Sequence, residues 1–388
     1  MPSLSQDLGA IQAPKPAFNP QPLSFPLSRP VYRHDVLSPD IWSIRLLRIH
    51  PSRTEVLPVC SLETFPYGAI PPFQALSYRW GAENTHARGH TVLINDTTYK
   101  VLPNLFDFMM YYSRIEFRED GSDTYLWIDQ ICIDQTNVVE RNVVVQHMGW
   151  IYKHAVRTLS WLGNDPDMVQ AAYTYQQSSS DYALCTLLSN QYFSRLWVVQ
   201  EILLSRESLV LCGYIWLSFV DMYNSAHKNP GMLSRIQRYS PSLHLLYDSL
   251  YLRKPKDRHL AHLIDLYSSN GCKDPRDHVY ALLGLVLEKE RVKIDYAKSI
   301  PEVFMDAFRV LLDSKDIPLD EYGRNPGVQM DVALVSCKLA WSMDLWEVRK
   351  GSRLEAWRKL YEHVEGNSTD EIIARFSHHI ARYLAGHF

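Results

Sequence analysis

Three short stretches of the sequence decide the fold: Phe73-Gln-Ala-Leu-Ser-Tyr-Arg-Trp-Gly81, Leu126-Trp-Ile-Asp-Gln-Ile-Cys-Ile-Asp-Gln135 and Phe193-Ser-Arg-Leu-Trp-Val-Val-Gln-Glu-Ile202. Each is a short apolar run that ends in polar or aromatic residues. Runs of this length are typical of strands that are buried on both faces of a parallel sheet, and of the helices that connect them. Together the three stretches predict the edges of one α/β cleft.

The central stretch belongs to a predicted strand–helix–strand unit. A strand at 125–128 is followed by Asn137, which can cap a helix, and by Glu140 in capping-box position. The helix is expected to run to about His154, with a buried stripe formed by Val144, Met148, Ile151, Tyr152 and Ala155. A second strand follows at 157–162. Two strands joined in this way should be parallel.

Further patterns extend this unit to a three-layer α/β domain over residues 41–220. Strands are predicted at 41–48, 74–78 and 208–212, and a hairpin at 91–102 turns at Asn95-Asp96-Thr97. Pro103 opens a helix to about Ser113. Residues 181–204 are expected to be helical in two pieces, with a break near Ser189-Asn190. The strands at 74–78, 125–128, 157–162 and 208–212 should lie side by side in one mostly parallel sheet.

The flanking regions have a different composition. Residues 1–40 form a predicted disordered, proline-rich arm, because seven of the 22 prolines fall in the first 30 residues and proline favours extended backbone. Residues 221–388 are predicted to be mainly α-helical. Within them Ser299, Pro301 and Glu302 mark a well-capped helix that runs to about Leu312.

Bulk properties exclude several classes of protein. A net charge of −3 gives no general attraction to nucleic acid or to an anionic membrane. The sequence has neither a membrane span nor a signal-peptide pattern. The six cysteines show no Cys-x-x-Cys spacing, so neither a zinc ribbon nor a disulfide framework is expected. These properties predict a cytoplasmic protein in a reducing compartment.

Ligands of open parallel sheets bind beyond the carboxyl ends of the strands. This rule selects Tyr78, Arg79 and Trp80 after one strand and Asp129 after the next. The helix after the third strand carries Ser194, Trp197 and Glu201, whose i, i+3, i+7 spacing predicts one shared helix face.

An aromatic ring near a carboxylate suits a nucleoside, because the ring can stack on the base and the carboxylate can bind ribose hydroxyls. A carboxylate can also stabilise an oxocarbenium-like transition state, and Arg79 would offer a donor fork to a phosphate. In the alternative interpretation Trp197 belongs to the core, and Glu201 pairs with Arg195 or another arginine. The spacing alone favours this alternative.

Other polar residues have plainer interpretations. Asp129 and Asp134 could bind a metal ion together, but capping of the next helix and of nearby turns is favoured. His259, His262, Cys272 and His278 fit no standard zinc spacing, so hydrogen-bonded or exposed histidines are expected and no metal site is predicted. Cys132 should have a raised pKa if Asp134 lies close to it, which argues against a nucleophilic role. No glycine-rich phosphate loop is present, and no bound cofactor is expected.

The motifs resemble one known family. The segment 73–81, the block from Leu126 to Asn137 with the helix after it, Trp161-Leu-Gly163 and Tyr192–Glu201 look like the fungal heterokaryon-incompatibility (HET) domain, a cell-death module. The segment Lys273-Asp-Pro-Arg-Asp-His-Val-Tyr-Ala-Leu-Leu-Gly-Leu285 resembles one that is common downstream in such proteins. The resemblance covers about residues 70–215 and this segment.

HET domains are similar in turn to Toll/interleukin-1 receptor (TIR) domains. Leu76-Ser-Tyr-Arg79 looks like the first TIR box, and Ser194-x-x-Trp197-x-x-x-Glu201 is similar to the helix that carries the catalytic glutamate of NAD-cleaving members. The resemblance implies a TIR- or flavodoxin-like fold. It implies NAD as the substrate and Glu201 as the catalytic residue, with Trp197 as its stacking partner.

The same resemblance leaves three functional hypotheses open. The first is a cell-death effector that hydrolyses NAD when it is activated by self-association. The second is a non-enzymatic module that binds an incompatibility partner protein through the same surface and recruits others. The third is a degenerate paralogue without toxicity. The sequence departs from many TIR domains at Leu196 and in the inserted hairpin at 91–102, so family membership does not by itself establish activity.

Overall fold

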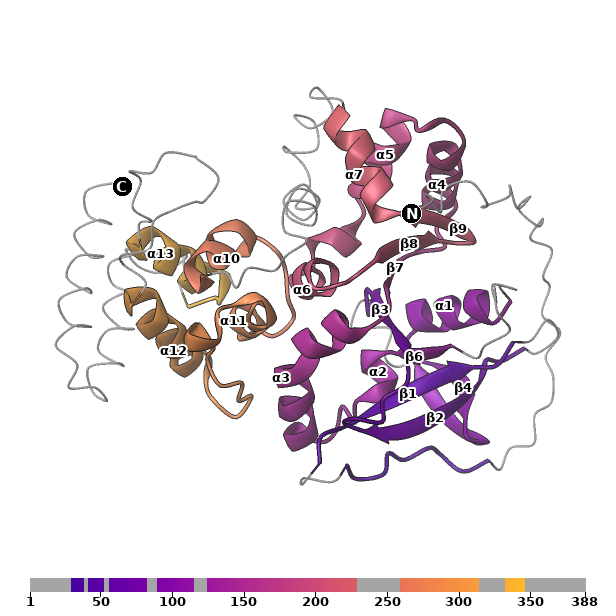
Figure 1. Cartoon of the computed structure of the whole chain (residues 1–388), viewed down its shortest axis with the longest axis horizontal. Helices are drawn as coiled ribbons and strands as arrows, with labels where there is room; N and C mark the ends of the chain where they lie inside the picture. Colours follow the sequence, from indigo (N-terminus) through magenta and orange to yellow (C-terminus); the bar gives the residue numbers. More distant parts are fainter. Residues whose placement is uncertain are drawn as a thin grey trace.

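A nine-stranded mixed sheet forms the centre of the molecule (Figure 1). The computed structural model describes residues 29–37, 41–51, 56–81, 89–114, 124–228, 259–313 and 332–345. Across the sheet the strands lie in the order β5-β4-β2-β1-β6-β3-β7-β8-β9. Their bounds are β1 (Ser43–Ile49), β2 (Val59–Pro66), β3 (Phe73–Tyr78), β4 (His90–Ile94), β5 (Thr97–Val101), β6 (Tyr125–Trp127), β7 (Thr158–Gly163), β8 (Ser208–Cys212) and β9 (Ile215–Ser218).

The four core strands confirm the predicted parallel arrangement. β6, β3, β7 and β8 are neighbours and run parallel, with Ala75 opposite both Trp127 and Thr158, and Thr158 opposite Ser208. They are almost wholly apolar because helices cover both faces. Numbered along the chain, the core strands lie in the order 2-1-3-4. The chain therefore leaves β3 to one side for β6 and returns to the other side for β7, which creates a switch point beside β3.

Antiparallel strands extend the core at both ends. β1 pairs with β2 and with β6, β4 pairs with β5, and β9 pairs with β8. The predicted hairpin at 91–102 is confirmed. Its turn has two residues, Asn95 and Asp96, both in the left-handed region at φ 48° and 62°, as tight hairpins between twisted strands require. β2 and β9 were not predicted.

Helices cover the two faces of the core strands. Ser160 and Trp161 are consecutive on β7, so their side chains point to opposite faces. Ser160 faces the chain that leads into α6, where it bonds to Tyr192, whereas Trp161 donates to Asn104 of α1. The helices of this region are α1 (Pro103–Arg114), α2 (Asp129–Cys132), α3 (Val138–His154), α4 (Pro166–Ser178), α5 (Asp181–Leu188), η3 (Gln191–Ser194) and α6 (Trp197–Leu203).

The predicted helix after β6 is confirmed, but its capping box is only half formed. The Asn137 side chain accepts from the backbone N–H of Glu140, as expected. The Glu140 carboxylate does not return to Asn137: it binds the guanidinium of Arg45 on β1 and the backbone N–H of Asp134. The competing buried cation explains this difference. All five residues of the predicted stripe on α3 and at its end are buried.

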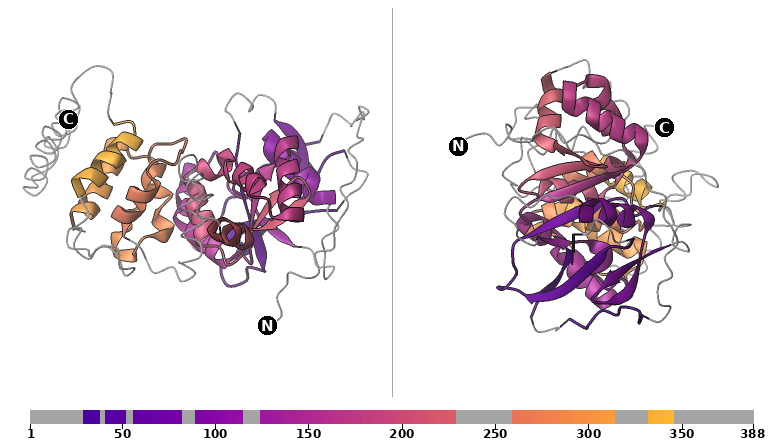
Figure 2. Two further views of the ribbon diagram at one scale, coloured as in Figure 1. Left: turned by 90° about the horizontal axis from the view of Figure 1, so that it is seen from above. Right: turned by 90° about the vertical axis from the view of Figure 1, so that its right-hand side faces the viewer.

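Beyond Ser218 the described elements are helical (Figures 1 and 2). The first of them, α7, packs on α5, β8 and β9, whereas the segment from α10 onward reaches α3 and α6 through η4. The capped helix predicted from Ser299 is confirmed, since the Glu302 carboxylate accepts from the backbone and hydroxyl of Ser299, both at 2.7 Å. The elements are α7 (Phe219–Lys228), α10 (Leu260–Tyr267), α11 (Asp277–Tyr280), η4 (Leu283–Leu285), η5 (Glu288–Glu290), α12 (Ile300–Asp313) and α13 (Val332–Ser342). The division into domains stays a prediction.

Most of the predicted arm, residues 1–28 and 38–40, lies outside the described residues. The described part, residues 29–37, contacts the α/β domain. Tyr32 donates its backbone N–H to the carbonyl of Thr98 on β5 (2.9 Å), and the His34 ring bonds to the carbonyl of Ile131 (2.7 Å). The proline content could not reveal these contacts, because they depend on backbone groups of β5 and α2, which are distant in the sequence.

Two glycines set how closely the C-terminal helices approach α3. A Cβ atom at Gly149 of α3 would lie 2.8 Å from the Cα of Gly284, and one at Gly284 would lie 3.0 Å from the Cα of Gly149. Real Cβ atoms do not come this close to another backbone, so glycine is required at both positions. The contact joins the central helix of the α/β domain to the segment that follows α11.

Replacement of Gly149 by alanine is expected to destabilise the protein. Alanine would favour the helix by about 0.5–1 kcal/mol, but the clash with Gly284 costs about 1–3 kcal/mol. Urea unfolding of the full chain measures the net effect. Val139→Ala, at a position of α3 that is 73% exposed, serves as the control. A more stable Gly149→Ala protein would contradict the close contact.

Candidate functional site

A buried polar cluster lies under α6 at the carboxyl end of β3. The carboxylate of Glu201, only 2% exposed, accepts a short hydrogen bond from the hydroxyl of Ser77 on β3. The hydroxyl of Tyr192 bridges Ser77 (2.6 Å) and Ser160 on β7 (2.8 Å). Ser77 and Ser160 are opposite each other in the parallel register, so both hydroxyls lie on one face. The cluster therefore spans the two strands at the switch point.

Arg195 is the cation of this cluster. Its Nη1 lies 3.7 Å from the Glu201 carboxylate, and its guanidinium also interacts electrostatically with Asp129. Burial alone would lower the pKa of Arg195, and the two carboxylates more than offset this effect. Among the described residues, Nη1 has no hydrogen-bond partner. Nη1 is therefore free to donate a hydrogen bond to a ligand.

The carboxylates of Glu201 and Asp129 share the positive charge of Arg195 in a poorly solvated environment. Burial raises the pKa of Glu201 above its ordinary value, although Arg195 and Ser77 partly oppose this shift. Burial likewise raises the pKa of Asp129, against the opposing effects of Arg195 and Trp80. Clusters of shifted carboxyl groups at the carboxyl edge of a parallel sheet are typical of functional sites, although structural ion pairs also produce them.

The structure brings part of the predicted site together. The indole of Trp80 donates to the carboxylate of Asp129 (2.9 Å), and the hydroxyl of Tyr78 contacts Gln130 (3.3 Å) beside it. Arg79 is exposed, and its backbone carbonyl accepts from Asn104 (2.6 Å). Whether these side chains bind a substrate stays a prediction.

The predicted common helix face of Ser194, Trp197 and Glu201 is wrong for Ser194. The break predicted at 189–190 is confirmed, but the chain also ends a 3₁₀ turn at Ser194 and begins α6 only at Trp197. Ser194 bonds to the carbonyl of Gln191 (2.8 Å) within that turn. Spacing arguments hold only inside one continuous helix, and this one is interrupted.

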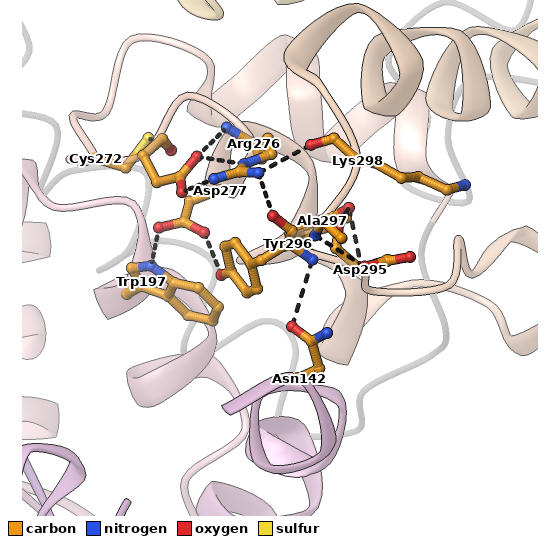
Figure 3. A network of polar contacts seen from close by, with 11 residues as sticks. Asn142, Trp197, Cys272, Arg276, Asp277, Asp295, Tyr296, Ala297 and Lys298 are labelled. Carbon is orange, nitrogen blue, oxygen red and sulfur yellow. Dashed lines mark hydrogen bonds and ion pairs between the residues drawn. The ribbon is translucent and has the colours of Figure 1, made fainter. Parts of the chain in front are cut away.

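Trp197 has a different partner from the one predicted. Its indole N–H donates to the carboxylate of Asp277 on α11 (3.0 Å), which also accepts from the hydroxyl of Tyr296 (2.5 Å), as Figure 3 shows. The stacking role that the resemblance implies for Trp197 stays a prediction. The predicted alternative, an ion pair of Glu201 with Arg195, is present.

The remaining candidates follow their plainer interpretations. Asp129 accepts from the backbone N–H of Gln130 (2.7 Å), and Asp134 accepts from Thr136 (2.6 and 3.0 Å), so both cap local turns. His259 bonds to Glu290 (2.6 Å). Burial raises the pKa of Cys132 to about 12, and Asp129 rather than Asp134 adds to the shift. The direction was predicted correctly, but the main cause was not.

Asp277 should give the protein an unusual pH dependence. Burial raises the pKa of Asp277 from 3.8 to about 6, while hydrogen bonds from Tyr296 and Trp197 oppose the shift. The titratable or charged groups around it are Asp274, Arg276, Cys272, Tyr296 and, beyond Tyr296, Arg141 on α3. A raised folded-state pKa means that the folded protein keeps a proton that the unfolded chain loses. The resulting stability is present in acid and is lost as the pH rises through about 6.

We therefore expect Asp277→Asn to gain stability relative to the natural protein between about pH 4 and pH 7. Asparagine has the same shape and stays neutral. The difference in free energy of unfolding between the two proteins should therefore change by on the order of 2 kcal/mol over this interval. Urea midpoints of both proteins at several pH values measure it. A difference that does not vary with pH would show that Asp277 titrates as it would in water.

Comparison with known proteins agrees with the sequence motifs. Residues 73–201 match the family described as heterokaryon incompatibility protein (HET). The matched segment begins at the first residue of β3 and ends at Glu201, so it contains all the predicted site residues. The chain is also similar to "Heterokaryon incompatibility protein 6, OR allele" from Neurospora crassa, with 24% identity over 365 residues. Both findings support the predicted HET resemblance.

The similarity has clear bounds. It covers 72% of this chain and 53% of the Neurospora protein, so the chain spans about half of the length of that relative. No solved structure matches this chain. The structure establishes a mixed α/β fold with a parallel core, and its closer classification as TIR- or flavodoxin-like stays a prediction. In the described part of the chain, no helix has the length and apolar character that a membrane crossing needs.

Proposed function

We propose that this chain acts in fungal heterokaryon incompatibility as a cell-death effector, and that the cluster around Glu201 cleaves NAD. The name of the Neurospora relative and the HET match over residues 73–201 support the first part. The observation that carries the second part is the buried carboxylate of Glu201 beside a cation, Arg195, that has a hydrogen-bond donor to spare. Both lie at the switch point of the parallel strands.

The proposed reaction is hydrolysis of the bond between nicotinamide and ribose. Nicotinamide leaves with the bonding electron pair as a neutral base, water adds its hydroxyl to the ribose carbon, and one proton is released. Positive charge develops on the ribose as the bond breaks, and the Glu201 carboxylate would stabilise it. Arg195 would bind an anionic or hydroxyl group of the substrate and hold Glu201 in its ionised form, against the effect of burial.

A second function is favoured by the same geometry. Glu201 is 2% exposed and already bound by Ser77, and Trp197 is bound by Asp277. Residues placed in this way can serve a purely structural purpose. The chain would then be a signalling module that binds an incompatibility partner protein, or a second copy of itself, and kills by recruiting other proteins.

Inducible expression of the full chain in a fungal host tests the proposal. The expected result is loss of viability with the natural protein and survival with Glu201→Gln. Glu207→Gln is the matched control, because it makes the same chemical change at an exposed glutamate just before β8 that pairs with Arg157 (3.1 Å) at the surface. Unchanged viability with the natural protein would contradict an effector role.

A further inference from the structure

The segment 270–277 is attached to the chain around α6 by backbone and side-chain bonds. Gly271 donates to the carbonyl of Ser194 (2.7 Å) and accepts from the N–H of Leu196 (2.9 Å), which makes a parallel bridge with Arg195. The amide of Asn270, 1% exposed, donates to the carbonyls of Phe193 and Arg195, both at 3.3 Å. The backbone of the cluster's cation is thus held by this segment.

The same segment also holds the first residue of α6. The Asp277 carboxylate accepts from the Trp197 indole on one oxygen and from the Tyr296 hydroxyl on the other (Figure 3). Tyr296 is tied in turn to α3, because its backbone N–H donates to the side chain of Asn142 (3.3 Å). Arg276 fixes the neighbouring loop by donating to the carbonyls of Tyr296 (2.6 Å) and Lys298 (2.9 Å).

These contacts add to the buried apolar residues Val198, Val199 and Ile202 in holding α6. It has seven residues, and its N-cap, Leu196, makes no side-chain capping bond. A helix this short is not stable by itself in water. On one side the Glu201 carboxylate ties α6 to Ser77 of β3, and on the other side segment 270–277 ties its start.

We propose that segment 270–277 is an intramolecular latch that keeps α6 in the position in which Glu201 is sealed from solvent. Release of the latch would free Trp197 and the backbone of Arg195, and would open a path to the Glu201 carboxylate. The consequence of release, that NAD reaches Glu201, rests on the proposed function, whereas the latch itself does not. The downstream motif, residues 273–285, overlaps the latch, and in this proposal it connects the helical region to the site.

Carboxyl footprinting of the full chain tests the latch directly. A water-soluble carbodiimide with an amine labels exposed carboxylates, and mass spectrometry reports the labelling of each residue. Asp277→Ala leaves two part-buried donors, on Trp197 and Tyr296, without their acceptor, and the loss of such a partner typically changes an opening equilibrium by a factor of about 5 to 150. We expect labelling of Glu201 to rise about tenfold, whereas labelling of the exposed Glu207 should stay constant.

Three further variants make the result specific. Trp197→Phe removes one donor and keeps an aromatic ring, although a smaller one, and it provides the test if Asp277→Ala does not fold. Asp277→Asn keeps an acceptor for Trp197, so it should restore most of the protection. Asp265→Ala breaks an ion pair with Lys338 on α13, away from α6, and should leave labelling of Glu201 unchanged. Equal labelling of Glu201 in the natural protein and in both latch variants would overturn the latch.

A nicotinamide-release assay on the same samples separates this proposal from the proposed function. Increased labelling of Glu201 together with increased release of nicotinamide supports both. Increased labelling without nicotinamide release supports the latch and contradicts NAD cleavage. Nicotinamide release by the natural protein at the same rate as by the released variants, with no change in labelling, contradicts the latch and supports the enzyme.

Discussion

Glu140→Ala is expected to destabilise the α/β domain by about 3–5 kcal/mol, the usual cost of leaving one member of a buried ion pair alone. Arg45 and Glu140 are 2% and 7% exposed, and the guanidinium binds both carboxylate oxygens, at 2.5 and 3.0 Å. Without Glu140, the partners that remain for Arg45 among the described residues are the carbonyls of Cys132 and Asp35. The urea midpoint of the full chain measures the loss.

A surface pair provides the control for this prediction. Glu63 lies 3.8 Å from Arg48, and its side chain is 46% exposed, so Glu63→Ala should change stability by less than about 1 kcal/mol. The double replacement Arg45→Met with Glu140→Leu should be less destabilising than Glu140→Ala alone, because no uncompensated charge remains. Equal effects of Glu140→Ala and Glu63→Ala would show that the buried pair does not hold β1 to α3.

Glu201→Gln is expected to keep the fold and to lower the rate of NAD cleavage by a factor of about 10² to 10³, the usual effect of removing one preorganised electrostatic group. Glutamine keeps an acceptor for the Ser77 hydroxyl. Arg195 keeps Asp129 as a nearby negative charge, so the loss of charge at Glu201 should not unfold the protein. The lost negative charge is the one that would stabilise the ribose cation.

The outcome distinguishes a catalytic role from a structural one. If Glu201 serves only to balance the charge of Arg195, Glu201→Gln should lower the melting temperature and leave killing intact. Glu207→Gln, at the exposed glutamate, should alter neither property. An unchanged melting temperature together with full killing and full NAD cleavage would rule out the catalytic role of Glu201.

The sequence predicts the core of the fold because the core strands are buried on both faces. Such strands appear as uninterrupted apolar runs, and the strand predicted at 74–78 agrees with β3 to within one residue. The caps of α3 and α12 are also readable, since Asn137 and Ser299 act within three residues of their partners. Local signals of this kind do not depend on the rest of the chain.

Elements that depend on tertiary context were missed or remained incomplete. β2 alternates weakly, with Cys60 and Leu62 buried and the residues from Glu63 onward mostly exposed. β9 follows β8 after a two-residue loop that starts at Gly213, with φ at 54°, so a hairpin signal was present but too short to stand alone. The helix α4 was also not predicted, although it has clear local signals: Asp165 caps its start and Pro166 is its first residue.

Only part of the candidate site was predictable, because some of its contacts join residues that are distant in the sequence. The switch-point rule correctly brings Trp80 to Asp129, because both follow neighbouring parallel strands. It cannot show that Asp277, distant in the sequence, takes Trp197 as its donor. Ser77 and Tyr192 were inside the quoted motifs but were not chosen, since a single hydroxyl on a strand gives no signal until its partners are known.

Release of nicotinamide by the purified full-length protein tests the central claim most directly. NAD is incubated with the natural protein and with Glu201→Gln at a concentration that favours self-association, and free nicotinamide is measured over time. We predict steady release by the natural protein and a rate about 10² to 10³ lower for the variant. Killing of the fungal host by a natural protein that leaves NAD intact would contradict the enzymatic account and favour recruitment of partner proteins.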